Sequence, residues 1–202
     1  MLSKVRSESP APLMALSLAR RCAIAALVVS CAGSVSTAAN LSAARALELQ
    51  GRTYFAEPPV LPRSTNYRST AGEGSPEYMI TLQVSASAGA ALGALEITQT
   101  RGVDRSFPFN LAQCRAFLGE PRREIATIPA SFQFDQSQRR FKVLFANPVA
   151  PGQTVTVVLR PWTNPLQSDT YMFSVLALPA GVDPVGAMTG FATFPIDPIE
   201  RW

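Results

Sequence analysis

Three alternating stretches decide the fold of this chain: R139-R-F-K-V-L-F145, T154-V-T-V-V-L-R160 and T170-Y-M-F-S-V-L-A-L178. Apolar residues, many of them β-branched or aromatic, recur at every second position, which is the pattern of half-buried antiparallel strands. A shorter alternation, F132-Q-F-D135, precedes them, and D135-Q-S-Q138 has the composition of a hairpin turn. This part of the chain therefore predicts four strands.

The rest of the chain adds further strands and one short helix. Tyr78–Val84 and Leu95–Thr100 alternate in the same way, whereas the polar segment Ser64–Pro76 is expected to be a loop. Asn110 can cap a short helix over Leu111–Leu118. The predicted fold class is all-β: an antiparallel β-sandwich with one short helix, for which an immunoglobulin-like arrangement is one option.

A single β-domain is expected over residues 51–202. Residues 40–50 before it form an N-terminal extension, which would be either a short helix or the loose start of the mature chain. The C-terminal tail is rich in Pro and Gly, but it contains Phe191, Phe194 and Trp202. Those aromatic residues predict that the tail packs on the sandwich.

Residues 1–39 have the organisation of a secretory signal peptide. Arg20 and Arg21 precede an uncharged, apolar run over residues 22–33, and small residues follow that run. Translation would start at Met1 or, with a more ordinary basic region, at Met14.

Processing of this leader is predicted to fall after Ala38 or Ala39. Two alternatives stay open, an uncleaved membrane anchor and a lipoprotein with a lipid on Cys31. The protein is thus expected to be exported, to the periplasm or the cell surface, and to contact a membrane only through its leader.

The charge of the chain does not point to nucleic acid. The net charge of +4 includes four basic residues and one acidic residue of the leader, and removing them from the totals of 18 and 14 leaves 14 and 13. A nearly neutral mature domain lacks the basic surplus of nucleic-acid-binding proteins.

Few side chains are available for catalysis. The chain has no histidine, which excludes Ser-His and Cys-His pairs and histidine metal sites. Cys114 is the single cysteine outside the leader, and its spacing from Leu111 and Leu118 predicts that it lies against the core. No cofactor, metal ligand or catalytic residue is predicted, and the protein is expected not to be an enzyme.

Carboxylates are the remaining acid–base groups, so an envelope hydrolase is the alternative function, and a small-ligand or metal carrier is a third. The acidic residues in or beside turns are Asp104, Glu120, Glu124, Asp135 and Asp169. No D-x-D-x-D-G calcium loop is present. Such residues commonly close turns or solvate loops.

Nine short motifs occur in a characteristic order. In the first half they are Y54-F-x-x-P-P, A88-G-x-x-L, I97-T-Q, R101-G-V-D104 and A116-F-x-G119. In the second half they are Pro148–Thr156 (P-V-x-P-G-Q-T-V-T), Leu159–Pro165 (L-R-P-W-T-N-P), T170-Y-M-F173 and L178-P-A-G181.

Together these motifs resemble an uncharacterised family of secreted cyanobacterial proteins, catalogued as domain of unknown function 2808, over about residues 50–191. The resemblance implies export and a compact β-domain, and it implies no activity, cofactor or catalytic residue. The chain departs from the family at G190-F-A-T-F194, which leaves the last strand open.

One connection is a candidate interaction turn, with Arg160, Trp162 and Asn164 as its residues. A Trp between two strands either caps the edge of the sandwich or stands exposed as an anchor for a partner. The sequence therefore predicts an exported, non-catalytic β-sandwich module with a structural or interaction role in the cell envelope. Its partner would be an unknown envelope protein or glycan.

Overall fold

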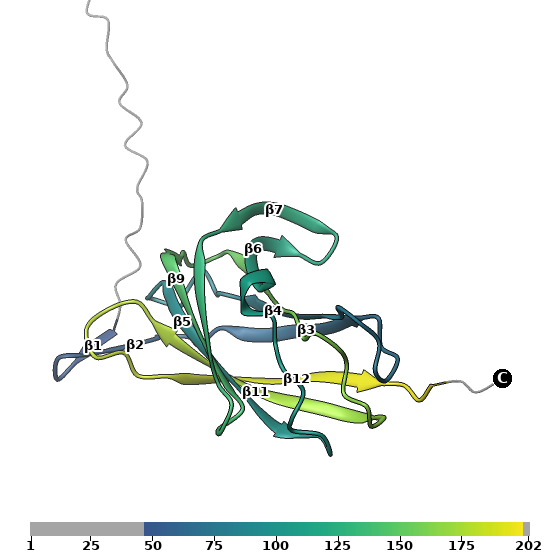
Figure 1. Cartoon of the computed structure of the whole chain (residues 1–202). Helices are drawn as coiled ribbons and strands as arrows, with labels where there is room; N and C mark the ends of the chain where they lie inside the picture. The colour runs from purple at the N-terminus through teal and green to yellow at the C-terminus, as the bar shows by residue number, and fades with distance from the viewer. Residues whose placement is uncertain (1–46, 200–202) are drawn as a thin grey trace, which may run out of the picture. The chain divides into compact units, whose positions relative to one another are not determined.

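The computed structural model describes residues 47–199 and contains two five-stranded antiparallel sheets (Figure 1). The strands are β1 (Leu47–Leu49), β2 (Arg52–Tyr54), β3 (Val60–Tyr67), β4 (Glu77–Gln83), β5 (Leu92–Arg101), β6 (Arg115–Glu120), β7 (Arg123–Ile128), β8 (Ala130–Asp135), β9 (Arg140–Val149), β10 (Thr154–Leu159), β11 (Asp169–Pro179) and β12 (Ala187–Ile196). The leader, with Ala38, Ala39 and Cys31, lies outside the described residues, as do residues 40–46 of the expected extension.

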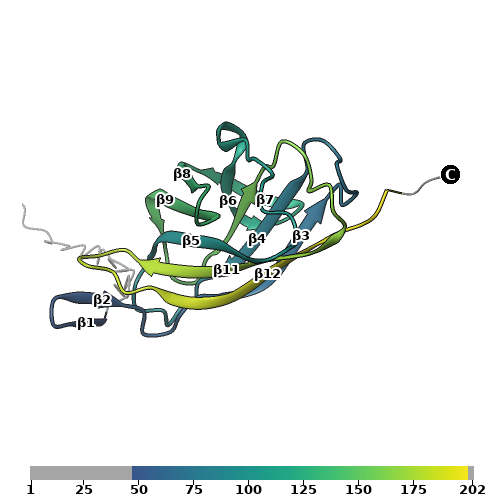
Figure 2. The same ribbon diagram turned by 60° about the horizontal axis from the view of Figure 1, so that its bottom comes forward.

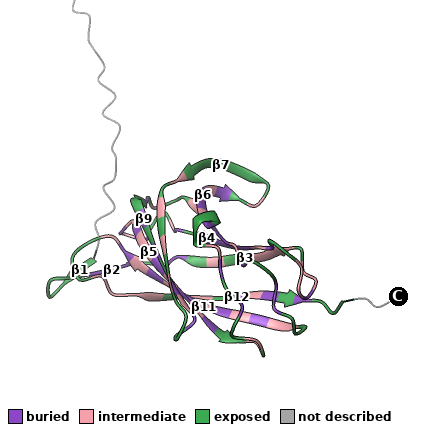
Figure 3. Ribbon diagram, in the orientation of Figure 1, coloured by how far each residue is buried: buried purple, intermediate pink, exposed green. Residues whose placement is uncertain are grey.

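The two sheets form a sandwich, which confirms the predicted all-β class. The first sheet has the order β3-β4-β10-β6-β7 and the second the order β12-β11-β5-β9-β8. The strands β1 and β2 form a separate two-stranded sheet, and Thr53 of β2 also bridges to Pro184. Figure 2 shows the two layers with β11 and β12 in front. Burial is concentrated on the central strands, whereas β7 is exposed along most of its length (Figure 3).

The four strands predicted from the alternations are present as β8, β9, β10 and β11. Three of them belong to the second sheet, and β10 crosses to the middle of the first. Phe141 and Phe173 from the second sheet and Val157 from the first are fully buried. The predicted hairpin turn is present between β8 and β9. The Asp135 carboxylate stabilises it by accepting hydrogen bonds from the Ser137 backbone and hydroxyl at 2.9 and 2.6 Å.

Residues 111–118 do not form the predicted helix. A 3-10 turn, η1, covers Leu111–Gln113, and the Asn110 side chain makes no capping hydrogen bond. The chain then enters β6, where Ala116 faces the main core and Phe117 the opposite face of the sheet. Pairing with β10 and this two-sided burial outweigh the helical spacing of the sequence.

The expected loop Ser64–Pro76 is also partly wrong, because β3 continues to Tyr67. The Ser64 hydroxyl donates to the Thr193 carbonyl at 3.1 Å and accepts from the Thr193 amide at 2.9 Å. These bonds join β3 to β12, the edge strand of the other sheet. Polar β3 side chains therefore serve as partners for an edge that would otherwise be open.

The strand β12 extends through the segment in which the chain departs from its family pattern. Phe194 of this strand stacks on Tyr78 of β4, with ring centres 4.6 Å apart, and contacts Phe173 at 5.7 Å. Phe194 of the tail thus joins the two sheets, whereas Phe191 is half exposed and Trp202 lies outside the described residues.

The β6–β7 hairpin bends back over the outer face of its own sheet. A register shift follows Leu118, and Gly119 has a φ of +107°, where a Cβ would collide with the Arg123 carbonyl oxygen. The bend brings the turn to β3 at the far edge of the sheet, because the Arg122 guanidinium lies 5.6 Å from the centre of the Tyr67 ring. In Figure 1 this hairpin arches above β4 and β3.

A second, small core lies on this outer face. Met79, Phe117 and Val158 are buried there and pack with Tyr67. The Thr156 hydroxyl donates to the Gly119 carbonyl at 2.7 Å, so a buried hydrogen bond holds the hairpin to the sheet. The middle of the first sheet is therefore buried on both faces.

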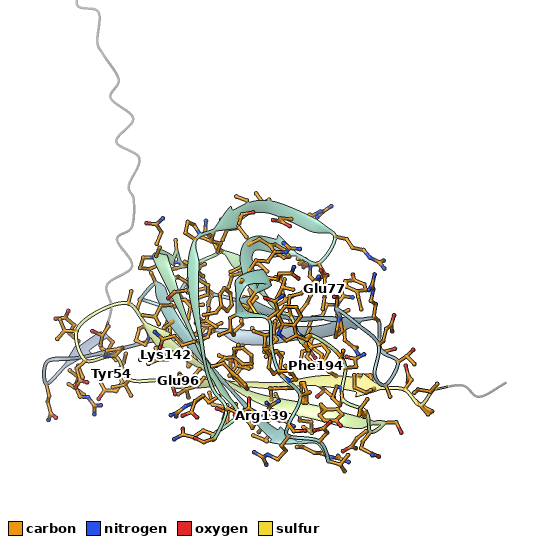
Figure 4. All side chains as sticks on the ribbon, viewed as in Figure 1. Tyr54, Glu77, Glu96, Arg139, Lys142 and Phe194 are labelled. Carbon is orange, nitrogen blue, oxygen red and sulfur yellow. The ribbon has the colours of Figure 1, made fainter. Side chains whose placement is uncertain are left out.

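One charged residue, Arg139, is buried at the end of the second sheet (Figure 4). Its guanidinium lies 4.5, 5.5 and 4.9 Å from the ring centres of Phe107, Phe109 and Phe134. Nε donates to the Gln99 side-chain oxygen and Nη1 to the Phe107 carbonyl, both at 3.0 Å. Burial removes the guanidinium from water and so lowers the pKa of Arg139 to about 10, whereas contact with the aromatic faces favours the cation.

We expect Arg139→Met to lower the free energy of unfolding by about 2 kcal/mol, because two buried acceptors lose their donors. Relief of the buried charge offsets part of the loss. The matched control is Arg140→Met, whose ion pair with Glu96 is long, at 3.7 Å, and which should change stability by less than about 1 kcal/mol. Urea denaturation of both variants measures this, and equal stability of Arg139→Met and the parent would contradict the structural role.

Candidate functional site

Three connections meet at one end of the sandwich, residues 68–76, 102–110 and 160–168. The Ser75 amide donates to the Trp162 carbonyl at 2.8 Å, and the Trp162 amide donates to the Pro108 carbonyl at 3.1 Å. The Asn110 amide donates to the Arg160 carbonyl at 2.7 Å. The predicted interaction turn is therefore clamped between two other loops.

Asn164 lies beneath this surface, with 1% of its area exposed. Its side-chain oxygen accepts from the Tyr78 hydroxyl at 2.8 Å. Its amide nitrogen donates to the carbonyls of Arg68 and Thr70 at 2.7 and 2.8 Å. Asn164 thus positions the loops and presents no surface to a partner.

Trp162 does not cap the edge of the sandwich, and its ring stands exposed. Its side chain is 56% exposed, although its backbone is hydrogen-bonded on both sides. Leu166 in the same connection is also exposed. A rigid backbone that carries an exposed indole ring is a suitable anchor for a partner, because little conformational entropy is lost on binding.

Arg160 lies beside Trp162 but points toward the first sheet. It forms an ion pair with Glu77 of β4. The two side chains line a cavity of about 370 Å³ together with Tyr67, Arg68 and Ser75. Figure 4 shows Glu77 below the β6–β7 hairpin.

A second cavity, of about 170 Å³, adjoins the first at Tyr67. It is lined by Arg63, Thr65, Tyr67, Pro121 and Arg122. We call the two cavities together the arginine groove. Four arginines and one glutamate line it, which gives it a net charge of +3.

The carboxylates that could have supported hydrolysis do not form an acid–base pair. Hydrogen bonds from Thr127 and then Arg115 lower the pKa of Glu124, and the Ser137 side chain lowers the pKa of Asp135. Burial acts to raise the pKa of Asp104, but hydrogen bonds, chiefly from Ser106, outweigh burial and lower it. A general acid needs a raised pKa.

Asp169, another of those carboxylates, accepts a hydrogen bond from the Val103 amide at 3.1 Å and lies 3.8 Å from an Arg101 nitrogen. It closes a turn there. Glu120 is exposed at the end of β6. Neither residue faces a second carboxylate in the hydrogen bonds and ion pairs of residues 47–199.

Cys114 is buried against the main core, as predicted. Burial raises the pKa of its thiol to about 11, which keeps the thiol protonated and unreactive at neutral pH. Across residues 47–199, no group of three or more Cys, Asp or Glu side chains is placed to hold a metal ion. The same residues contain no helix long and apolar enough to cross a bilayer.

The fold defines a class: a two-sheet antiparallel β-sandwich. The particular family follows from the sequence. Residues 52–196 match the family described as "Protein of unknown function (DUF2808)", and the chain belongs to that family. No curated protein matches the chain.

Several solved structures are similar to the chain over part of their length. The collagen-binding subdomain of the Enterococcus faecalis surface protein ACE has a TM-score of 0.40 and 9% identity, over 66% of this chain and 97% of that one. The bacterial hydrophobin BslA has a TM-score of 0.38 and 15% identity, over 70% and 99%. The group B streptococcus pilus 2b backbone protein has a TM-score of 0.39 and 13% identity, over 63% of this chain.

The chain spans about half of the length of that pilus protein, with 55% of it covered. With TM-scores below 0.5, these similarities assign neither a partner nor an activity to this chain.

The sequence singled out the connection with Arg160, Trp162 and Asn164 as a candidate, but it did not single out the arginine groove. Arg63, Tyr67 and Arg122 are far apart in the chain, and they meet only because the hairpin bends at Gly119. The sequence signal was the basic pair Arg122–Arg123 at a hairpin turn, which more often marks a solvated turn.

We expect Tyr78→Phe to lower the free energy of unfolding at neutral pH by about 1–3 kcal/mol, because the buried Asn164 oxygen loses its donor. Burial raises the pKa of Tyr78 far above its usual range, so the unfolded chain releases the phenolic proton first. That release lowers the stability of the parent above a pH of about 10, and the difference between parent and variant should shrink there.

Urea denaturation of parent and variant across this pH range measures both effects. The control is Tyr67→Phe, since the Tyr67 hydroxyl makes no hydrogen bond among the described residues. A Tyr78→Phe variant as stable as the parent at neutral pH would show that Asn164 is not held by this bond.

Proposed function

We propose that the protein is an exported, non-catalytic module of the cell envelope that binds a partner through the surface around Trp162. The observation that carries this proposal is an exposed indole ring on a backbone fixed by two hydrogen bonds. An exposed Trp on a rigid loop is the kind of residue that dominates binding energy at interfaces. The buried Asn164 below it keeps the loop in place without occupying the surface.

The lack of an acid–base pair among the described carboxylates favours binding over catalysis. The Cys114 thiol has a raised pKa. The carboxyl groups of Asp104, Glu124 and Asp135 have lowered pKa values. These groups are therefore inert as nucleophile or general acid near neutral pH. The proposed partner is an envelope protein or a glycan.

In-cell crosslinking from a photoreactive residue introduced at Leu166, beside Trp162, tests the binding role. We expect a discrete crosslinked partner, and Trp162→Ala should abolish it while changing the free energy of unfolding by less than about 1 kcal/mol. The matched control is Phe191→Ala, which removes an exposed aromatic ring from β12 and should leave the crosslink intact.

If Trp162→Ala lowers stability strongly and keeps the crosslink, the ring is a structural cap and the proposed surface is wrong. Loss of the crosslink in both variants would mean that the partner binds elsewhere.

Export has its own test, the N-terminal mass of the protein from membrane and soluble fractions. We expect a chain that begins after Ala38 or Ala39 in the soluble fraction. A lipid-modified Cys31 in the membrane fraction would instead show that the exported protein is tethered to a membrane. A full-length chain confined to the cytoplasm would contradict export.

A further inference from the structure

We infer that the arginine groove is a binding site for an acidic polysaccharide, whose carboxylate or sulfate groups the arginines bind. This inference rests on the proposed binding role and adds the class of ligand. The groove runs between the β6–β7 turn and the strands β3 and β4. Its position beside Trp162 places both surfaces at one end of the sandwich.

The charge of the groove is locally unbalanced. Removing the six basic and two acidic residues outside 47–199 from the totals of 18 and 14 leaves twelve of each, a net charge of zero. The groove alone carries +3. The remaining described residues therefore carry a net charge of −3. The positive charge is concentrated in the groove, and it attracts an anionic ligand there.

The arginines of the groove have unused donor capacity. Arg160 is paired with Glu77, and Arg68 donates one hydrogen bond, from Nη1 to the Gly74 carbonyl at 3.0 Å. Arg63 and Arg122 form no ion pair with a carboxylate of the described residues. A guanidinium presents its donors as a planar fork, which matches the oxygens of a carboxylate or sulfate group.

The backbone around the groove is strained. Six non-glycine residues of the described chain have a positive φ, and three of them line the groove: Arg68 at 60°, Ser75 at 52° and Arg122 at 69°. Left-handed backbone is unfavourable for residues other than Gly. Glycine would relieve this strain at Arg122. The arginine there instead places a guanidinium over the Tyr67 ring, at the wall of the groove.

The lining favours a glycan over a peptide or a nucleic acid. Hydroxyl groups of Thr65, Tyr67 and Ser75 stand among the arginines, and these can bond sugar hydroxyls. A peptide partner would use an apolar pocket for an anchoring side chain. Single-stranded nucleic acid would use aromatic faces in the groove for stacking. The aromatic ring of the groove is that of Tyr67, which packs on the second, small core and is covered by Arg122, so it is not free to stack on a base.

Calorimetric titration of the purified protein with dextran sulfate and polygalacturonate tests the inference, with neutral dextran as the uncharged control. We expect binding of both anionic polymers, weakening as salt is raised, and no binding of dextran. Arg122→Gly should weaken binding about tenfold or more. Its thermal midpoint should be unchanged or higher, because Gly accepts the left-handed backbone.

Arg63→Gln, in the extended backbone of β3, is the second variant and covers the case in which Arg122→Gly disturbs the hairpin. The matched control is Arg52→Gln, which removes one positive charge from β2, where Arg52 pairs with Asp183 at 2.9 Å. This control should bind like the parent. If Arg52→Gln weakened polysaccharide binding as much as Arg63→Gln, the loss would reflect the overall charge of the protein, and the groove would not be the binding site.

The inference is also overturned if the parent binds neither polymer or if Arg122→Gly and Arg63→Gln bind like the parent. Binding of polyglutamate or single-stranded DNA more tightly than both polysaccharides would overturn the class of ligand. These results are separable from the proposed function, because a Trp162-dependent crosslink would persist without any affinity of the groove for anions.

Discussion

The candidate surface depends on one buried amide, that of Asn164. Its oxygen is held by Tyr78 in the main core, and its nitrogen holds the carbonyls of Arg68 and Thr70 in the neighbouring loop. An amide buried without partners would cost free energy, so the fully bonded arrangement is the one that the fold selects. The exposed position of Trp162 follows from it, because the ring stands two positions before the fixed amide in the same short connection.

The second constraint is that the first sheet is buried on both faces at its centre. A sheet of this kind needs a cover on each side, and here the second sheet supplies one and the sheet's own β6–β7 hairpin the other. The bend at Gly119 that makes this possible carries the turn to β3. The groove beneath the turn is thus a consequence of how the chain covers Phe117 and Val158.

Period-two alternation predicted the all-β sandwich, the four strands after Phe132 and the Asp135 turn, because a two-residue repeat depends only on local geometry. The prediction failed where tertiary contacts override local preference. Leu111–Leu118 has helical spacing, yet β10 draws its second half into a strand. The polar residues of β3 resemble a loop, yet their side chains bond to β12 across 129 residues of sequence. A rule based on neighbouring residues cannot predict hydrogen-bond partners that are so far apart in the sequence.

The candidate connection could be singled out because its three residues lie close together in the sequence, although the structure buries Asn164 beneath the surface and pairs Arg160 with Glu77 in the groove. The groove could not, because its charge is assembled from separate strands and a turn. In the binding mode inferred for the groove, the groove and the Trp162 surface have different physical roles. Charges at a groove govern the association rate and its salt dependence, whereas a desolvated aromatic ring slows dissociation. A ligand that reaches both would therefore be recognised without an apolar pocket.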